Sequence, residues 1–273
     1  MMSAKIAEAL PQDAPLLGRV QSGPILHLTL NRPLQYNALS EEMLGALRRE
    51  FAQIRSDGSV RVVVLGGAGK AFCAGHDLRQ IRDNAKADFH RWLFSECAQL
   101  MGQLRALPQP VIARVHGLAT AGGCQLVASC DLAVASRDAR FATSGINIGL
   151  FCATPAVALT RNIAQKPAFE MLFTGEFIDA DSARALGLVN RVVAPERLDE
   201  EIERLASSIL SKPAHIVAAG KELFYRQQEM GVEAAYQLAT QAMACNLQEP
   251  DAQEGIDAFL NKRRPNWLST GRG

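Results

Sequence analysis

Short apolar runs, each bounded by glycine, proline or polar residues, divide the first two thirds of the chain. Runs of this kind are typical of strands that are buried on both faces of a sheet. They predict five strands, at residues 25–30, 62–65, 111–115, 132–134 and 188–193. The residues before Ile25 contain no such run and predict a loosely structured lead-in.

Apolar residues at helical spacing separate these runs. After Ser40, which can cap a helix, apolar residues recur every three or four positions up to Ile54. A second helix is predicted at residues 89–107, where Pro108 ends it. From Pro195 onward the pattern is almost wholly helical, and we expect helices at 195–211, 213–230, 231–247 and 250–263. This order of elements predicts an α/β core with at least partly parallel strand pairing.

Three parts of the chain follow from this order: a flexible lead-in at residues 1–18, the α/β core at 19–194 and a helical C-terminal region at 195–273. A chain of 273 residues is long enough for one large α/β domain, and its net charge of +1 predicts no nucleic-acid partner.

No stretch approaches the roughly 20 apolar residues of a membrane span. The first residues lack the character of a signal or transit peptide, so we expect a cytoplasmic protein.

Common motifs for cofactors and metals do not match. Gly66 to Lys70 has the glycines of a phosphate-binding loop, but Val64 and Ala71 stand where that motif needs glycine and serine or threonine. The six cysteines include no CxxC pair, and the five histidines form no pair with metal-ligand spacing. We therefore expect reduced thiols, no metal site and no cofactor.

Two glycine-rich segments, each after a predicted strand, are the remaining candidates for a site. They are AFCAGHDL at 71–78 and HGLATAGGCQL at 116–126. Small residues at Ala74, Gly75, Gly122 and Gly123 would let a ligand approach the main chain closely. Two backbone N–H donors converging from separate loops would form an oxyanion hole. The residue types alone would be explained equally well if both segments were merely tight turns between a strand and a helix.

The order of motifs along the chain resembles the enoyl-CoA hydratase/isomerase (crotonase) family. The similarity lies in the two segments above, in Asn31-Arg32-Pro33 with Asn37-Ala38-Leu39, in Phe173-Thr174-Gly175, and in the ending from Phe259 to Pro265. This resemblance implies an α/β fold of the ClpP/crotonase type, a spiral of β-β-α units with a C-terminal helical trimerisation region. It also implies an acyl-CoA or enoyl-CoA ligand, no cofactor beyond that thioester substrate, and a homotrimer or a dimer of trimers.

The same resemblance assigns roles to individual residues. The backbone N–H groups of His76 and Gly122 would form the oxyanion hole for the thioester. The residues implied to contact CoA or substrate are Arg32, Ala38, Leu39, Ala74, Gly75, Asp77, Leu78, Gly123, Phe259 and Lys262. Phe259 and Lys262 resemble positions that close the CoA site, sometimes from a neighbouring subunit. Independently of these roles, Asp77 is interpreted as a hydrogen-bond acceptor that stabilises its loop.

Two positions depart from the family pattern. Hydratases of the family use two glutamates, and the matching residues here are Gln125 and Gly145. Gln125 could orient a water, Gly145 would contribute only space, and neither can act as a general base. An enzyme acting through a thioester enolate in fatty-acid metabolism is the leading hypothesis, with ordinary hydration reduced. A non-catalytic acyl-CoA binder is one alternative, and thioester hydrolysis, decarboxylation or C–C cleavage is another. Whether the His76 side chain takes part stays open.

Overall fold

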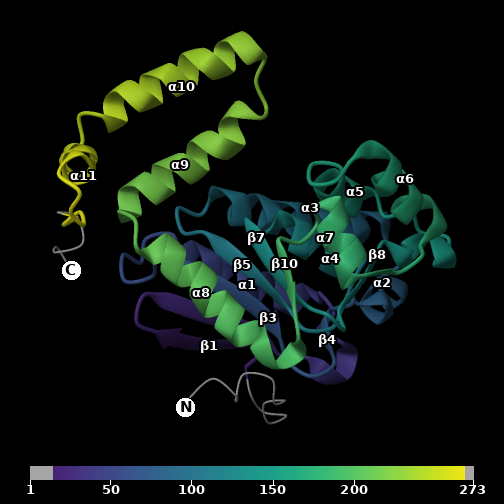
Figure 1. Cartoon of the computed structure of the whole chain (residues 1–273). Coiled ribbons are helices and arrows are strands. Elements are labelled where there is room, and N and C mark those ends of the chain that lie inside the picture. The colour runs from purple at the N-terminus through teal and green to yellow at the C-terminus, as the bar shows by residue number, and fades with distance from the viewer. Residues whose placement is uncertain (1–14, 268–273) are drawn as a thin grey trace.

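Two sheets form the centre of the protein in the computed structural model, which describes residues 15–267 (Figure 1). The larger sheet has the strand order β1 (Leu17–Ser22), β2 (Ile25–Leu30), β3 (Val62–Gly67), β5 (Val111–Val115), β7 (Leu132–Ser136) and β10 (Arg191–Val193). The smaller sheet has the order β4 (Ala71–Cys73), β6 (Leu118–Thr120), β8 (Arg140–Ala142) and β9 (Ile178–Asp179). Only β1 and β9 pair antiparallel with their neighbours, so the predicted parallel pairing is confirmed for the rest of the described strands.

Each repeat of the chain adds one strand to each sheet and then a helix. β3 and β4 are followed by α2 (Leu78–Asp83) and α3 (Ala87–Ala106), and β5 and β6 by α4 (Gly122–Ser129). β7 and β8 lead into the 3-10 helix η2 (Ser144–Ile148), α5 (Ala153–Leu159), α6 (Gln165–Thr174) and α7 (Ala180–Leu186). This succession confirms the predicted spiral of β-β-α units.

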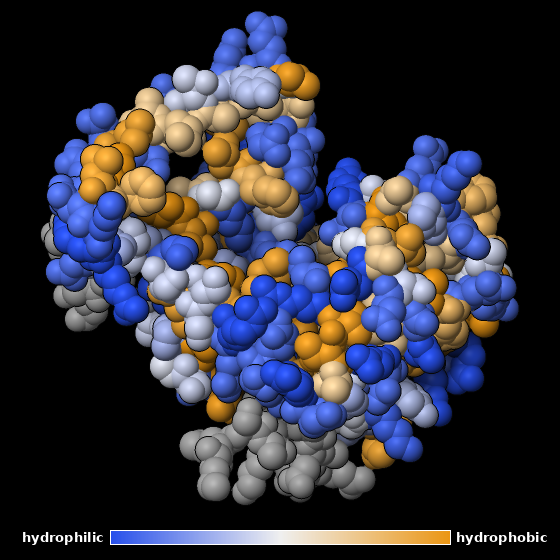
Figure 2. Space-filling view, viewed as in Figure 1, coloured by the Kyte–Doolittle hydropathy of each residue, from blue (hydrophilic) through white to orange (hydrophobic). Residues whose placement is uncertain are grey.

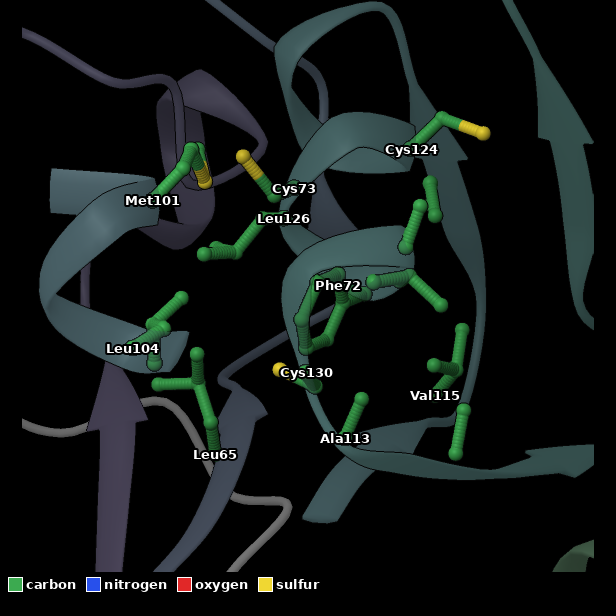
Figure 3. Packing of buried hydrophobic residues seen from close by; sticks show 14 of the residues in the cluster. Leu65, Phe72, Cys73, Met101, Leu104, Ala113, Val115, Cys124, Leu126 and Cys130 are labelled. Carbon is green, nitrogen blue, oxygen red and sulfur yellow. The ribbon is translucent and has the colours of Figure 1, made fainter. Parts of the chain in front are cut away.

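The main core lies where the sheets meet the helices. Figure 3 shows Phe72 of β4 beside Leu126 and Cys130, with Leu65 of β3 and Leu104 of α3 nearby. All of these side chains are buried. Burying one large apolar side chain contributes roughly 1.5–3 kcal/mol, so this cluster holds β4 and α4 firmly in place.

Some elements differ from the sequence prediction. β1 falls in the predicted lead-in, because its alternating, mostly exposed residues do not form an apolar run. β4 and β6 lie inside segments predicted as loops, since three residues are too few to show a periodicity. The strand predicted from Leu188 begins only at Arg191. Residues 1–14 of the predicted lead-in lie outside the described part of the chain.

Helices at the start and end of the chain flank this core. η1 (Pro33–Gln35) and α1 (Glu41–Ile54) precede β3, and Ser40 caps α1 as predicted. After the 3-10 helix η3 (Pro195–Arg197), α8 (Leu198–Leu210) packs on the larger sheet through Leu198, Ile202 and Leu205. Leu198 and its neighbours meet side chains of β3, β5 and β7 there, so this helix belongs to the core.

The last three helices extend away from the sheets, as Figure 1 shows. They are α9 (Ala214–Gln227), α10 (Val232–Asn246) and α11 (Pro250–Leu260), and they confirm the helices predicted at 213–230, 231–247 and 250–263. We call α10 and α11 the C-terminal arm. α10 buries none of its side chains, and Figure 2 shows apolar surface on the arm beside a hollow that separates it from the rest of the molecule.

Candidate active site

Three loops meet at one edge of the smaller sheet. Because β4, β6 and β8 are parallel neighbours, their carboxyl ends lie at the same edge. Each end leads into a loop, and the loops carry Ala74–His76, Ala121–Gly122 and Ser144–Gly145. Residues of all three line a cavity of about 390 Å³, which we call the loop cavity. The structure thus brings His76, Gly122 and Gly145 together from distant parts of the chain.

The first two loops are in direct contact at Gly75. This residue has a φ of +89°, and a Cβ atom there would lie 2.9 Å from the backbone N of Gly122. At Gly123 a Cβ atom would lie 2.0 Å from the carbonyl oxygen of Cys73. Only glycine fits at such distances, so the small residues predicted to admit a ligand first allow the two loops to pack against each other.

The backbone N–H groups of His76 and Gly122 have no acceptor among the described residues. Leu39 donates its N–H to the Gly75 carbonyl (2.8 Å) and accepts from the Asp77 N–H (3.3 Å), so the N–H of His76 points away from Leu39. Gly122 is the first residue of α4, where the helix itself offers no acceptor. The two free N–H donors, of His76 and Gly122, therefore lie next to each other in the wall of the loop cavity.

Ala121 sets the direction of the second donor. Its φ is +50° and its ψ is −118°, a conformation that L residues rarely adopt. A hydrogen bond from its N–H to the Ala142 carbonyl (2.9 Å) ties it to the end of β8. The strained turn starts α4 directly at Gly122 and orients the N–H of Gly122.

Arg32 and Asp77 connect the first loop to the N-terminal part of the chain. The Arg32 guanidinium donates to the Ala38 carbonyl and to the Asp77 carboxylate, both at 3.0 Å. Asp77 also caps α2 by accepting from the backbone N–H of Arg79 and Gln80. Burial opposes ionisation of Asp77, but these hydrogen bonds outweigh it and lower the pKa of its carboxyl. The interpretation of Asp77 as a loop-stabilising acceptor is confirmed.

The remaining predicted contacts of this region lie close to the same loop. Leu39 is fully buried, and its side chain lies 3.4 Å from where a Cβ atom of Gly122 would be. Ala38 is buried, whereas Leu78 is exposed and Ala74 is half-buried, and these last two line the loop cavity. Contact of these residues with a ligand along the first loop stays a prediction.

Gln125 faces a different space. Its side chain lines a second cavity of about 320 Å³ between α3, α4, α5 and α9, which we call the helix cavity. It is 4% exposed, and its Oε1 atom has no partner. Within the described residues Gln125 does not line the loop cavity, so the water that it was predicted to orient would lie in the helix cavity instead.

The space predicted at Gly145 is absent. A Cβ atom at this position would lie 2.4 Å from the Leu150 carbonyl oxygen and 2.8 Å from the Cys152 sulfur. The loop after η2 folds back, with Leu150 donating its N–H to the Gly145 carbonyl (3.0 Å), and fills the place of a side chain. The prediction that Gly145 opens the site was wrong, because it ignored this local turn.

Phe259 and Lys262 lie at the end of the C-terminal arm. Phe259 is 83% exposed and lines a groove formed by α9 and α11, and Lys262 is exposed just after α11. Neither residue lines the loop cavity of its own chain in the described structure. They could close a CoA site only in another copy of the chain.

Most of the cavity wall was not singled out from the sequence. Apolar and small residues dominate it, with contributions from α2, α3, η2 and α5. They are Ile81, Phe94, Ile148, Leu150, Phe151, Cys152, Ala153, Thr154 and Pro155. No sequence pattern joins these positions, because they meet only through the stacking of successive repeats.

The fold and the site define an α/β spiral protein with two free backbone donors beside an apolar cavity. The chain matches the family model described as enoyl-CoA hydratase/isomerase over residues 21–270, and it belongs to this family. A crystal structure of an enoyl-CoA hydratase from Mycobacterium smegmatis is similar to it with a TM-score of 0.92 and 58% identity, covering 93% of this chain and 99% of that one.

The similarity extends to one named branch of the family. The enoyl-CoA hydratase domain-containing protein 3 of Xenopus laevis is 46% identical over 94% of this chain and 87% of the relative. The crystal structure of the human protein of that name has a TM-score of 0.89 and 44% identity, covering 93% of this chain and all of that one. These relatives agree with the family resemblance inferred from the sequence.

The cytoplasmic location expected from the sequence is contradicted. The relatives from Xenopus laevis, Rattus norvegicus, Mus musculus and Homo sapiens are all named as mitochondrial. The expectation failed because short targeting segments determine the cellular location of a protein. The composition of the folded domain does not indicate that location. In the described part, no helix has the length and apolar character needed to cross a membrane.

Proposed function

We propose that this chain binds acyl-CoA thioesters and stabilises a thioester enolate. The observation that carries the proposal is the pair of unengaged backbone N–H groups at His76 and Gly122, both in residues that line the loop cavity. Donors that are held in place before charge develops stabilise an enolate oxygen most effectively. Arg32, Ala38, Leu39 and the loop from Ala74 to Leu78 would hold the CoA part.

Family membership supports this assignment. Besides the relatives above, a Syntrophomonas wolfei protein named crotonyl-CoA hydratase is 32% identical over 89% of this chain and 94% of its own length. An activity on acyl-CoA thioesters in fatty-acid metabolism agrees with this name and with the largely apolar cavity wall.

Proton transfer at the thioester is favoured over addition of water. Within the described residues no carboxylate lines the loop cavity, Gln125 faces the helix cavity, and the place of a side chain at Gly145 is filled. General acid–base groups typically contribute a factor of roughly 10²–10⁴ in rate. We therefore expect hydration of 2-enoyl-CoA to be slower, by about this factor, than in a family hydratase that has both glutamates.

Calorimetric titration of the purified protein with short-, medium- and long-chain acyl-CoAs tests the binding, and turnover of the matching 2-enoyl-CoAs tests the hydration. We expect binding with slow or no hydration. Failure to bind any of these thioesters would rule out the proposed function, and rapid hydration would contradict the argument from the missing carboxylates.

A glycine variant tests the two donors directly. In Gly75→Ala the new Cβ atom has to push the two loops apart, which displaces both N–H groups. We expect roughly a 10²-fold loss in any enolate-dependent activity. Gly23→Ala is the matched control, because Gly23 also has a positive φ (+56°) but no atom within 4 Å of the new Cβ. Equal losses in both variants would argue against the proposed role of the loops.

A non-catalytic acyl-CoA binder is the second candidate. It is supported by the same absence of a carboxylate from the described cavity wall. The two candidates differ in one measurable property: an enolising enzyme exchanges the protons at Cα of a bound thioester with solvent, and a passive binder does not. The third possibility, thioester hydrolysis, decarboxylation or C–C cleavage, gains no support from Gly145, where a Cβ atom would lie 2.4 Å from the Leu150 carbonyl oxygen.

We further propose that the protein acts as a homotrimer or a dimer of trimers. The C-terminal arm exposes large apolar side chains at Tyr236, Met243, Phe259 and Leu260, and such a surface is normally covered by a partner. A second copy of the chain is the partner that would also bring Phe259 and Lys262 to a CoA site.

A further inference from the structure

The imidazole ring of His76 is a polar group without a partner in the loop cavity. Both ring nitrogens are buried without a well-formed hydrogen bond, and the nearby Leu39 backbone only partly offsets the effect of burial on the ring's pKa. The ring packs edge-on against Phe94, with centroids 5.0 Å apart, and its Cδ2 atom lies 3.6 Å from where a Cβ atom of Gly122 would be. Leaving a buried donor or acceptor unpaired costs about 1–3 kcal/mol, so the empty site holds a group that is suited to a ligand.

The other polar groups of the cavity are engaged or inert. Ser144 shares a hydrogen bond with Thr120 (2.7 Å between the hydroxyl oxygens). Burial raises the pKa of the Cys152 thiol, which keeps it protonated. Asp77 is adjacent in sequence, but its carboxylate is occupied by Arg32 and by the start of α2. Of the side chains that line the cavity in the described structure, His76 is therefore the one suited to accept a proton.

The position of this ring matches the proposed oxyanion hole. Its own backbone N–H is one of the two free donors, and the ring itself lies against Gly122, which carries the other. A thioester oxygen held by these donors would bring the adjacent Cα to the same wall of the cavity as the imidazole. Because both ring nitrogens have almost no accessible surface, the ring has to turn into the loop cavity before a nitrogen can reach a Cα proton.

We propose that the His76 imidazole removes and returns the proton at Cα of a bound acyl-CoA thioester, an inference that rests on the proposed enolate function. The lone pair of a ring nitrogen takes the Cα proton, the C–H electrons form the C=C bond of the enolate, and the carbonyl oxygen becomes the oxyanion. The imidazolium then returns the proton to Cα, or to Cγ of a 3-enoyl thioester, which moves the double bond into conjugation. No further reactant is needed.

The environment of the ring agrees with this role. Burial lowers the pKa of His76 to about 4, so the ring is neutral at pH 7, although the same burial makes it a weaker base than a free imidazole. The imidazolium formed in the step would lie beside the enolate, whose negative charge favours it. Cys152 is the other titratable side chain of the described cavity wall, and it is neutral in this range.

Exchange of the Cα protons of butyryl-CoA in D₂O, followed by mass spectrometry, tests the inference. His76→Gln and His76→Ala both keep the backbone N–H but lose the base. We expect exchange to fall by roughly 10²–10⁴-fold in both variants while the affinity for butyryl-CoA changes little. Added imidazole should restore part of the exchange in His76→Ala, which a purely structural role of the ring would not produce.

His27→Gln is the matched control, because His27 also has its pKa lowered by burial but lies on β2, outside the loop cavity. Its exchange rate should equal that of the wild type. Undiminished exchange in His76→Gln, or a wild type that binds butyryl-CoA without any exchange, would overturn the role of His76 and leave the binding function standing. A wild type that binds no CoA thioester would instead remove the proposed function itself.

Discussion

Burial in the loop cavity holds the pKa of His76 at about 4, against 6.5 for an unperturbed histidine. Between these values the unfolded chain binds a proton that the folded chain does not, so the free energy of unfolding decreases as the pH falls from 6.5 towards 4. At 1.36 kcal/mol for each pKa unit, this group accounts for about 3 kcal/mol of stability, present above pH 6.5 and lost near pH 4.

This dependence can be measured in the His76→Gln variant. Urea unfolding at pH 7 and at pH 4.5 should show a smaller decrease for the variant than for the wild type, by about 2–3 kcal/mol, because glutamine does not titrate. Carboxylates contribute equally to both proteins and cancel in the comparison. The same decrease in both proteins would mean that the ring is not buried as described.

At the scale of elements, one buried ion pair attaches α9 to the core. Lys221 of α9 donates to the Asp131 carboxylate (2.6 Å) and to the carbonyls of Leu104 (2.9 Å) and Gln109 (3.0 Å). Asp131 also accepts from the Val111 N–H (2.6 Å) at the start of β5. Burial lowers the pKa of Lys221, although the Asp131 charge opposes this effect.

Replacing this lysine should therefore be costly. Lys221→Met leaves the buried Asp131 charge without its partner, and we expect a loss of about 3–5 kcal/mol in the free energy of unfolding, measured in urea. Arg226→Gln removes a positive charge from an exposed position on the same helix and should change stability by less than about 0.5 kcal/mol. A similarly small effect of Lys221→Met would show that α9 is held by its apolar contacts alone.

At the scale of the whole molecule, the apolar side chains of the C-terminal arm stay exposed in a single copy of the chain. Phe259 and Leu260 are 83% and 72% exposed at the end of α11. Burial of such side chains between copies would contribute roughly 1.5–3 kcal/mol each. The proposed trimer would use this surface, and the site of each copy would be completed by the arm of another.

Sedimentation velocity tests the assembly. We expect three or six copies for the wild type and a shift to smaller species in the Phe259→Asp/Leu260→Asp double variant. Leu34→Asp is the control, because Leu34 is similarly exposed (73%) but lies in η1, away from the arm. A monomeric wild type, or an unchanged double variant, would contradict the proposed assembly.

Local sequence patterns were sufficient for the main elements and for the loops of the site. Apolar runs identified β2, β3 and β5, and the cap at Ser40 identified the start of α1. The glycines of the two loops were recognised because close approach of main chain is a property of the residue itself. Family motifs placed these loops in the right fold, and the structure brings them to one cavity.

The directions of the side chains came only from packing. Gln125 was singled out by its position in a motif, yet it faces the helix cavity, because the contacts of α4 with its neighbours determine which way each of its residues points. Gly145 was taken as open space, yet the chain folds back after it and brings Leu150 and Cys152 into that place. Main-chain features are set by nearby residues, whereas the contents of a cavity depend on segments that meet only when the repeats stack.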